Sequence, residues 1–377
     1  MFILRFFGFT FNENILNYRS FKHILEFIPS LNTKISEQEI NTNNNTNNNS
    51  NNGFKLITTI NSFYATNILN KQSKVIVSLS GGIDSMVLVT ILKLLGCTVI
   101  AVHINYNNRA ETREEQKFLE LWCNYNGIKL HTKVITNIKR ATSKRSDYEI
   151  ESKLIRFGFY KEVMAYENLD CILLAHHKDD IVENIFANVC RGRDILNLAV
   201  IKETSVIDNV TIMRPLISHY KSDIYEFAEI YQVPYFKDTT PIWSVRGKYR
   251  NNITPALEET FSSNVKENLI SLSKQSDGWN ELIMTQIVEP FISTINYTTN
   301  SCNFDLNRDS KYNTYPLCFW RIIFMRIFYH FGKNAPSHKG IETFMRDISN
   351  RKVSYISISN HCTCRNKNLY ITFEFKP

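Results

Sequence analysis

The segment SGGIDS, at residues 80 to 85, carries the strongest chemical signal in this sequence. It follows the apolar run VIVSL and precedes MVLVTILKLL, an order that predicts a buried strand, a tight turn and a helix. Two glycines at such a turn let backbone N–H groups approach phosphate oxygens at the start of the helix. We therefore expect a nucleotide phosphate site formed by Ser80, Gly81, Gly82, Ile83, Asp84 and Ser85.

The side chains of this segment refine the prediction. Ser80 and Ser85 can donate hydroxyl hydrogen bonds to phosphate, whereas a carboxylate cannot, so Asp84 is expected to hold Mg²⁺. The segment lacks the GK[ST] ending of a Walker A loop, which disfavours the usual transfer of a γ-phosphoryl group. The structural alternative is an ordinary glycine turn whose Asp and Ser cap the helix.

A second polar group, HHKDD at residues 176 to 180, follows the apolar run CILLA. Asp180 and Glu183 are three residues apart and therefore share one face of the predicted helix, and His177 stands at the start of that helix. These three residues are candidate catalytic residues. The alternative is a solvated helix start whose acids are favoured by the helix dipole.

Alternating strands and helices must position both groups. Apolar runs at residues 75–79, 98–104, 129–135 and 171–175 alternate with periodic segments at 85–95, 111–125, 149–166 and 179–190. This alternation predicts an α/β fold with a mainly parallel, doubly wound sheet that is covered by helices on both faces. Ligands bind beyond the carboxyl ends of the strands in such sheets. We expect SGGIDS, residues 103–109 and HHKDD to converge there.

The sequence divides into three predicted parts. Residues 41–52 read NTNNNTNNNSNN and contain no apolar residue, so residues 1–53 are expected to be an N-terminal extension with a disordered linker. Residues 54–252 form the expected catalytic domain, with further helices at 56–69 and 222–231. Residues 253–377 show helical patterns at 317–331 and 340–349 and alternating runs at 354–358 and 369–375, so they predict a helical module with a small β tail.

The composition favours a soluble protein of more than one domain. The chain has 377 residues, of which 43% are hydrophobic, and this is enough for a buried core. Its formal net charge of +8 suits a polyanionic partner such as nucleic acid. The longest apolar stretch, at 317–331, contains Arg321 and Arg326 and is too short to cross a bilayer, so no membrane association is expected.

The eight cysteines form no CxxC pair and no regular framework, which indicates reduced thiols in an intracellular compartment. Cys362 and Cys364 form a lone CxC beside His361 that no further ligand completes, so zinc is not expected. The apolar opening MFILRFFGFTF is compatible with an organellar transit peptide or a cytosolic extension. We expect the protein in the cytoplasm, with the matrix of a mitochondrion or plastid as the alternative.

On these motifs, residues 74–252 resemble the PP-loop, or N-type ATP pyrophosphatase, superfamily, whose signature is SGGxDS. Within it the chain resembles the tRNA(Ile)-lysidine synthase family, whose AHHxDD motif is present as AHHKDD. The family's HVNHxLR segment, Arg-Gly pair, RPL segment and D(S/T)N and RN motifs correspond here to residues His103 to Arg109, Arg191 with Gly192, Arg214 to Leu216, Asp238 to Thr240, and Arg250 with Asn251.

The chain departs from the family pattern in several places. Tyr106 stands where a second histidine is usual, and Asn108 replaces a leucine. Glu183 and Asn184 stand where the family commonly has an ET pair. The family's ARxxRY helix is only approximated, by Lys153, Arg156, Phe157 and Tyr160.

The resemblance implies an adenine nucleotide α-hydrolase-like fold and an ATP-dependent ligase that forms a C–N bond. Such an enzyme adenylates the C2 carbonyl oxygen of the wobble cytidine in a tRNA(Ile) with a CAU anticodon, and the ε-amine of free L-lysine then displaces AMP. The expected ligands are therefore ATP, Mg²⁺, lysine and tRNA, while the oligomeric state stays open.

The clustering of these residues and their places beside the motifs indicate roles for individual residues. His177, Asp180 and Glu183 are expected to orient the lysine amine or the base. Arg109 is a further catalytic candidate, and His103 is expected at the nucleotide. The expected RNA contacts are Arg191, Arg214, Arg250 and Asn251.

Three alternatives remain, of which a small-molecule PP-loop ligase is disfavoured because no glutaminase segment is visible and the basic composition favours RNA. A tRNA thiolase would use the same adenylation with sulfur as the nucleophile, although such enzymes usually carry CxxC pairs and this chain has none. A catalytically inactive tRNA-binding homologue is suggested by Tyr106 and by the imperfect ARxxRY helix. Exchange between ATP and pyrophosphate would separate this homologue from both enzymes.

Overall fold

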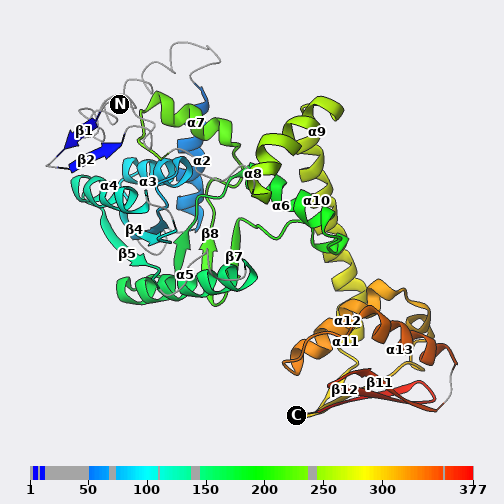
Figure 1. Ribbon diagram of the computed structural model, residues 1–377. Helices are drawn as coiled ribbons and strands as arrows, with labels where there is room; N and C mark the ends of the chain where they lie inside the picture. Colours follow the sequence, from blue (N-terminus) through cyan, green and yellow to red (C-terminus); the bar gives the residue numbers. More distant parts are fainter. Residues whose placement is uncertain are drawn as a thin grey trace. The chain divides into compact units, whose positions relative to one another are not determined.

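The chain forms two compact units in the computed structural model, which describes residues 3–6, 9–12, 51–67, 74–108, 111–136, 145–236, 244–350 and 353–376 (Figure 1). Unit 1 comprises residues 1–193 and 198–273, and unit 2 comprises residues 194–197 and 274–377. Residues 253–273, which follow the predicted catalytic domain, thus belong to unit 1. The predicted linker lies outside the described residues, except that its last two residues begin helix α2 (Asn51–Asn67).

A six-stranded sheet forms the centre of unit 1, in the order β5-β4-β3-β6-β8-β7. Strand β7 is antiparallel to β8, and the other neighbouring pairs are parallel. This sheet confirms the predicted α/β class. The strands are β3 (Lys74–Ser78), β4 (Thr98–Asn105), β5 (Lys129–Val134), β6 (Cys171–Leu173), β7 (Thr204–Ile207) and β8 (Val210–Met213).

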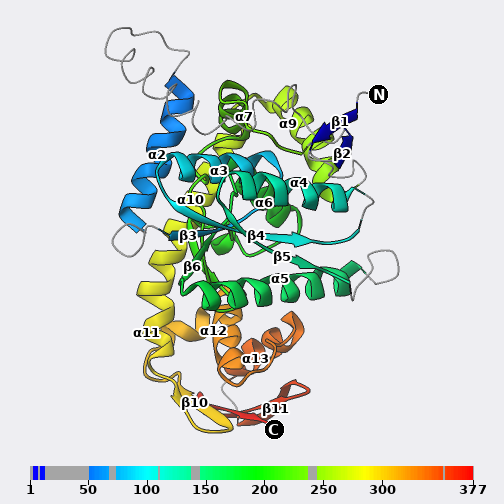
Figure 2. The same cartoon turned by 90° about the vertical axis from the view of Figure 1, so that its left-hand side faces the viewer.

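Helices cover both faces of this sheet, as the two views in Figures 1 and 2 show. Val75 and Val77 of β3 pack into one core, and Ile76 between them packs into another. Successive strand residues point to opposite faces, so a strand that is buried on both faces must be apolar throughout. One core lies under α2, α3 (Ile83–Leu94), α4 (Thr112–Tyr125) and α7 (Lys221–Ile230), and the other lies under α5 (Arg145–Glu167).

The chain changes direction across the sheet between β3 and β6. From β3 it passes to β4 and β5 on one side, whereas β6 lies on the other side of β3. In sheets of this kind a crevice forms at the carboxyl ends of the strands between which the order reverses. SGGIDS follows β3 and HHKDD follows β6, so both motifs lie at this crevice.

The hairpin of β7 and β8 was not predicted. Its two-residue turn consists of Asp208 and Asn209, which have φ values of 50° and 60°. Asp and Asn tolerate this left-handed conformation, and such turns suit the twist of a hairpin. The short strands on either side gave too weak a pattern to identify the pair.

Four further helices of unit 1 follow β6 and α7. A short π-helical segment at Tyr249–Ile253 lies between two of these helices, α8 and α9. A small antiparallel pair, β1 (Ile3–Phe6) with β2 (Phe9–Asn12), lies at the start of the chain. The helices are α6 (Lys178–Cys190), α8 (Val245–Lys248), α9 (Thr254–Phe261) and the first part of α10 (Val265–Ile283).

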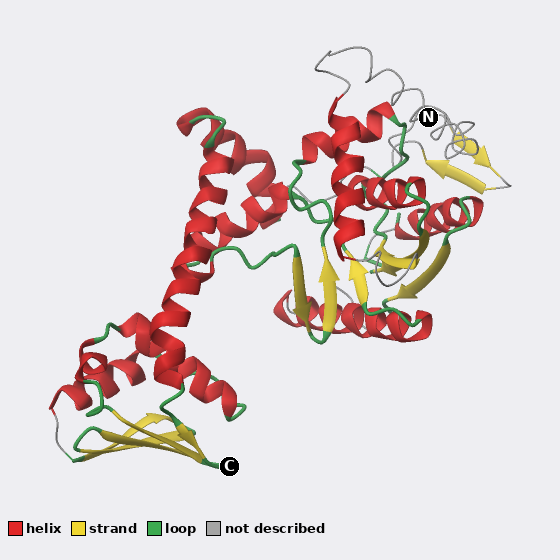
Figure 3. Ribbon diagram, turned by 180° about the vertical axis from the view of Figure 1, so that it is seen from behind, coloured by secondary structure: helices red, strands yellow, loops and turns green. Residues whose placement is uncertain are grey.

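Unit 2 has a core of its own between helices and a five-stranded antiparallel sheet in the order β11-β12-β13-β10-β9 (Figure 3). Trp320 packs edge-on against Phe344, and Phe324 packs against Phe373 of the sheet. The predicted helical module and β tail are present, although the tail has three strands more than the two predicted runs. The strands are β9 (Asn296–Tyr297), β10 (Ser301–Asp305), β11 (Ser354–Ser359), β12 (Cys362–Lys367) and β13 (Tyr370–Phe375).

The helices of unit 2 lie on one side of this sheet (Figure 1). The predicted helices at 317–331 and 340–349 are observed as α12 (Leu317–His330) and α13 (His338–Asn350). Within the described ranges, no helix is both long and apolar enough to span a bilayer. The remaining elements are 3-10 turns at Ile195–Asn197 and Ser310–Thr314, a π-helical turn at Met284–Val288 and α11 (Glu289–Ile292).

Candidate active site

The glycine turn after β3 depends on Gly81, which has a φ of +85°. A Cβ atom at this position would lie 2.4 Å from two ring carbons of Phe236. The backbone N–H of Phe236 also donates to the carbonyl oxygen of Gly81, at 2.9 Å. Both the backbone conformation and this close approach therefore require glycine.

The two serines of the motif hold the turn together from inside. The hydroxyl of Ser85 donates to the carbonyl oxygen of Gly82 at 3.0 Å and lies 3.1 Å from the hydroxyl of Ser80. Helix α3 starts immediately after Gly82 and has no side-chain hydrogen bond at its N-cap. Its N-terminal N–H groups are thus free of a capping side chain, as an anion site requires.

Asp84 lies on the first turn of α3 and contacts two other elements. Its Oδ2 atom accepts from Nζ of Lys221 at 2.9 Å, and its Oδ1 atom lies 3.7 Å from Nε2 of His177. Oδ1 is buried and accepts no hydrogen bond from the described residues. One carboxylate oxygen with no hydrogen-bond donor fits Mg²⁺, which commonly uses one or two carboxylates together with substrate phosphates.

The acidic cluster at the start of α6 is paired with arginines. Asp180, which is buried, accepts from Arg246 and, at 3.2 Å, from Nη2 of Arg250. Glu183 accepts from Nε of the same two arginines, at 3.2 Å each. The backbone N–H of His177 donates to Oδ2 of Asp180 at 3.1 Å, which completes a capping box.

The charges of this cluster are balanced. Burial alone would raise the pKa of Asp180, but the positive fields of His177 and Arg246 outweigh it, and the pKa is lowered. Burial likewise opposes ionisation of Asp179, but His177, whose Nδ1 lies 3.6 Å from the carboxylate, and the backbone N–H of Lys221, which donates to it, lower its pKa. Both carboxyl groups are therefore ionised at neutral pH.

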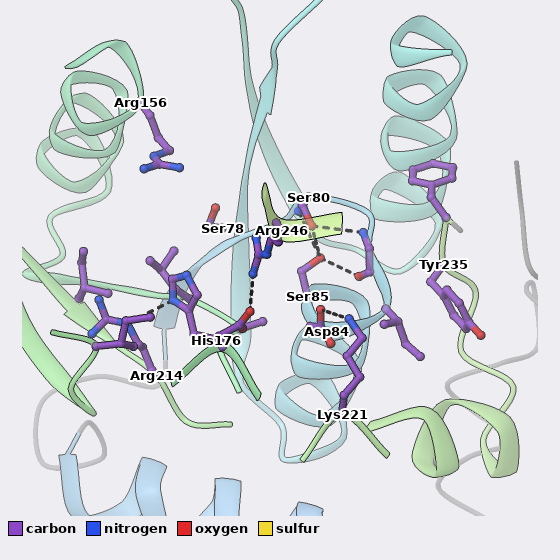
Figure 4. Close-up of a pocket in the computed structure, with 18 of the residues that line it drawn as sticks. Ser78, Ser80, Asp84, Ser85, Arg156, His176, Arg214, Lys221, Tyr235 and Arg246 are labelled. Atoms are coloured by element: carbon purple, nitrogen blue, oxygen red, sulfur yellow. Dashed lines mark hydrogen bonds and ion pairs between the residues drawn. The ribbon is translucent and has the colours of Figure 1, made fainter. Parts of the chain in front are cut away.

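On the opposite side of the crevice, the positive charges of Arg156 and Arg214 are not balanced by ion pairs with described residues (Figure 4). Arg214 is only 3% exposed, and its Nη1 atom donates to the carbonyl oxygen of Lys202 and to the hydroxyl of Ser205. Its Nε atom donates to Nδ1 of His176 at 3.2 Å. Arg156 lies nearby, and neither arginine forms an ion pair with a described residue.

These groups line one pocket of about 580 Å³ in unit 1. In Figure 4, the glycine turn, Asp84 and Lys221 lie on one side of it, and Arg156, His176 and Arg214 lie on the other. Apolar walls come from Phe157, Ile207 and Ile212. The pocket therefore offers an anion site at a helix start, a carboxylate for a metal ion and a chamber rich in hydrogen-bond donors.

The structure brings together most of the predicted site residues. Ser80, Gly82, Ile83, Asp84, Ser85, Asp180, Arg214 and Arg250 line the pocket. Gly81, in the same turn, is buried. His177 and Glu183 contact Asp84 and the arginines respectively, one step away from the pocket. His103 is buried under the turn, where its Nδ1–H donates to the carbonyl oxygen of Leu79 at 2.9 Å.

Other predicted residues lie elsewhere. Arg191 is an exposed residue at the C-terminal end of α6, far along that helix from the pocket. Asn251 is exposed, and its side chain donates to the carbonyl oxygen of Gly247 in the preceding helical turn. Arg109 lies outside the described residues, as do the three residues at 238–240 that match the D(S/T)N motif.

Sequence reasoning gave no role to His176, and it missed three residues that reach the site from distant elements. Lys221 pairs with Asp84, Arg246 pairs with Asp180, and Phe236 closes the glycine turn. Each is far in sequence from its partner and belongs to no motif that we recognised. Lys221 directly precedes the predicted helix at 222–231, a position that could have drawn attention to it.

The sequence has clear relatives. The profile of the PP-loop domain family matches residues 54–257. A tRNA(Ile)-lysidine synthase of Chlamydia felis is 28% identical over 240 residues, which is 63% of this chain and 74% of the relative. A tRNA(Ile)-lysidine synthase of Staphylococcus aureus is 29% identical over 231 residues, which is 58% of this chain and 52% of the relative, so the match spans about half of that protein.

The fold also has a solved counterpart. A U34-tRNA thiolase from Methanococcus maripaludis, solved with its [4Fe-4S] cluster, superimposes with a TM-score of 0.50 and is 20% identical in sequence. The superposition covers 63% of this chain and 82% of the thiolase. Among the described residues of this chain, no three His, Cys, Asp or Glu side chains are grouped so that they could hold a metal ion.

Proposed function

This chain belongs to the PP-loop family, and from that premise we propose that it is an ATP-dependent tRNA(Ile)-lysidine synthetase. The proposal rests mainly on one observation: the SGGIDS turn, Asp84, Asp180, and Arg156 with Arg214 all line the same pocket. The named relatives support the choice of substrate, because two tRNA(Ile)-lysidine synthases match more than half of this chain.

The proposed reaction has two steps. In the first, the C2 carbonyl oxygen of a wobble cytidine attacks the α-phosphorus of ATP, and pyrophosphate leaves. In the second, the ε-amine of free lysine attacks C2, the bond from C2 to the adenylated oxygen breaks, and AMP leaves. The lysine amine loses its protons during the second step, and the product is lysidine.

The residues of the glycine turn suit the first step. Backbone N–H groups at the start of α3 would bind phosphate oxygens and stabilise the charge that develops on pyrophosphate. Asp84 would hold Mg²⁺ through its Oδ1 atom, and the metal ion would supply further charge stabilisation at the phosphates. Lys221 keeps the other oxygen of Asp84 in place.

The acidic cluster suits the second step. Asp180 and Glu183 are ionic partners of two arginines at the pocket edge, so this position already accommodates cationic side chains. We propose that the two carboxylates orient the cationic lysine substrate or the base. Two further expectations remain part of this proposal. Arg109 is a catalytic candidate, and the expected RNA contacts are Arg191, Arg214, Arg250 and Asn251.

The test is incorporation of radiolabelled lysine into tRNA(Ile) with a CAU anticodon by the full-length protein and Mg-ATP. We expect label in the RNA, and we expect Asp84→Ala to abolish it, while Asp170→Ala, a change at an exposed aspartate ahead of β6, leaves it intact. Pyrophosphate release with tRNA but without lysine incorporation would reject lysine as the nucleophile and favour the thiolase alternative. The absence of both activities would indicate a tRNA-binding homologue.

A further inference from the structure

Two buried histidines of unit 1, His103 and His219, and the half-buried His176 have partners of different kinds. Nδ1 of His103 lies 2.9 Å from the carbonyl oxygen of Leu79, and Nδ1 of His219 lies 3.2 Å from a carboxylate oxygen of Asp223. Both oxygens can only accept a hydrogen bond, so both Nδ1 atoms carry a proton. His176 differs, because its Nδ1 atom faces a donor.

That donor is Nε of Arg214, at 3.2 Å. A guanidinium only donates hydrogen bonds and stays protonated in proteins, so Nδ1 of His176 must accept with its lone pair. A neutral imidazole whose Nδ1 lacks a proton carries its proton on Nε2. Arg214 therefore selects the tautomer of His176 that is opposite to that of His103 and His219.

The surroundings keep the ring neutral. Burial lowers the pKa of His176 to about 4. Of the charged groups nearby, Asp180 favours the charged ring, whereas Arg214, Arg246 and His177 oppose it. With a neutral ring, the single lone pair is already used by Arg214 and is not available to take a proton from a substrate.

Arg214 is itself fixed in place. Its Nη1 atom donates at 2.6 Å to the carbonyl oxygen of Lys202 and at 2.9 Å to the hydroxyl of Ser205, and the side chain follows directly on the end of β8. The hairpin that the sequence did not reveal thus positions the guanidinium, and the guanidinium orients the imidazole.

The chamber around this pair favours an oxygen ligand. His176, Arg214 and Arg156 all line the pocket, and Nε2 of His176 forms no hydrogen bond with a described residue. Guanidinium groups and a neutral Nε2–H group present only donors. The adjoining walls include the apolar side chains of Phe157, Ile207 and Ile212, so a ligand oxygen that reaches these donors is favoured there.

We infer that His176 contacts the substrate as a hydrogen-bond donor, offering its Nε2–H to an acceptor oxygen, and that Arg214 is the positioning residue that fixes this tautomer. The inference rests on the proposed function for the identity of the substrate. The oxygen belongs to a phosphate of ATP or to the RNA nucleotide that is modified, and both sources share the same acceptor chemistry.

The first test is the tautomer itself. Long-range ¹H–¹⁵N correlation spectra of the full-length protein, labelled at histidine nitrogens, report which ring nitrogen carries the proton, and the His176→Gln variant assigns the signals. We expect His176 to show a protonated Nε2 and an unprotonated Nδ1 at pH 7, and His103 and His219 to show the reverse. A protonated Nδ1 at His176 would overturn the inference whether or not the protein makes lysidine.

The second test compares two substitutions in the full-length protein. The glutamine amide of His176→Gln reaches the position of Nε2 and retains a donor, whereas the shorter His176→Asn keeps an acceptor for Arg214 and loses the donor. We expect tRNA-dependent exchange between ATP and pyrophosphate to be about tenfold lower in His176→Asn than in His176→Gln, as expected for one lost hydrogen bond. Equal losses in the two variants would instead indicate a proton-transfer role and reject the donor.

Affinity measurements locate the oxygen and do not need turnover. A His176→Asn variant that binds Mg-ATP about tenfold more weakly places the acceptor on ATP, and one that binds only the tRNA more weakly places it on the RNA. Both results support the donor. Unchanged affinity for both ligands would overturn it. His219→Asn, which alters a buried histidine that does not line the pocket, serves as the control for indirect effects on folding.

Discussion

Nζ of Lys221 lies 2.9 Å from Oδ2 of Asp84, although 137 residues separate the two in the sequence. The pair joins the first turn of α7 to the first turn of α3 and leaves the other oxygen of Asp84 facing His177. The carboxylate on which the proposed metal site depends is therefore held by a second element of the fold.

Loss of this cation should impair the nucleotide site. We expect Lys221→Met to lower ATP–pyrophosphate exchange about 10- to 100-fold, because Asp84 loses its partner next to the bound phosphates. Lys221→Arg, which keeps the charge, should be affected less. Lys161→Met, at an exposed position of α5, is the matched control. Exchange in Lys221→Met within about twofold of the unaltered protein would show that the pair is not needed.

Gly81 should not tolerate alanine. Its φ of +85° is unfavourable for a side chain, and the new Cβ would lie 2.4 Å from the ring of Phe236. We expect Gly81→Ala to lower the free energy of unfolding by about 1–3 kcal/mol and to weaken ATP binding. Gly158→Ala is the control, because this helical glycine has no atom within 4 Å of the added Cβ. That change should be neutral or stabilise the protein by up to about 1 kcal/mol.

The double variant Gly81→Ala with Phe236→Ala separates the two causes. Removing the ring relieves the close contact but leaves the backbone strain. Part of the lost ATP affinity should therefore return. Full recovery of ATP affinity would show that the backbone strain does not contribute to the loss. No recovery would show that the contact with the ring of Phe236 does not contribute.

Glu167 should make part of the stability sensitive to acid. Burial alone would raise the pKa of its carboxyl group, but hydrogen bonds from Lys129, Lys74 and His131 outweigh it and lower the pKa to about 2. A carboxyl pKa below its ordinary value of 4.5 stabilises the folded state above pH 4.5, and this contribution is lost as the pH falls towards 2.

We therefore expect Glu167→Gln to lower the free energy of unfolding by about 1–2 kcal/mol at pH 7, a value reduced because the two lysines are partly solvated. Urea unfolding at several pH values would measure it, and the difference should shrink below pH 4.5. Glu162→Gln, in an exposed pair with Lys133, is the control. A difference that does not depend on pH would argue against the charge as the cause.

The ion pair between Asp180 and Arg246 should couple more strongly than an exposed pair. Asp180 is 7% exposed, and removal of Arg246 leaves this buried carboxylate with Arg250 as its remaining arginine partner. A double-mutant cycle with Asp180→Asn and Arg246→Gln should give a coupling of about 1–3 kcal/mol in urea unfolding. The same cycle on Lys153 and Asp208, which are 45% and 43% exposed, should stay below about 1 kcal/mol. Equal couplings would contradict the assigned burial.

The local features of this protein could be derived from the order of its residues. Two glycines between an apolar run and an amphipathic segment indicated the turn at Gly81 and Gly82, and the structure places that turn between β3 and α3. The alternation of strands and helices indicated the parallel sheet and hence the edge at which HHKDD meets the turn. These inferences succeed because strand and helix periods and turn chemistry depend on neighbouring residues.

The tertiary structure alone decided which distant side chains complete the site. No spacing in the sequence relates Lys221 to Asp84, Arg246 to Asp180, or Phe236 to Gly81, because each pair depends on how separate elements pack. The β7–β8 hairpin, which anchors Arg214 and through it the tautomer of His176, was hidden for the same reason. Its strand β8 pairs with β6, and no local pattern encodes this contact, which joins the hairpin to the sheet.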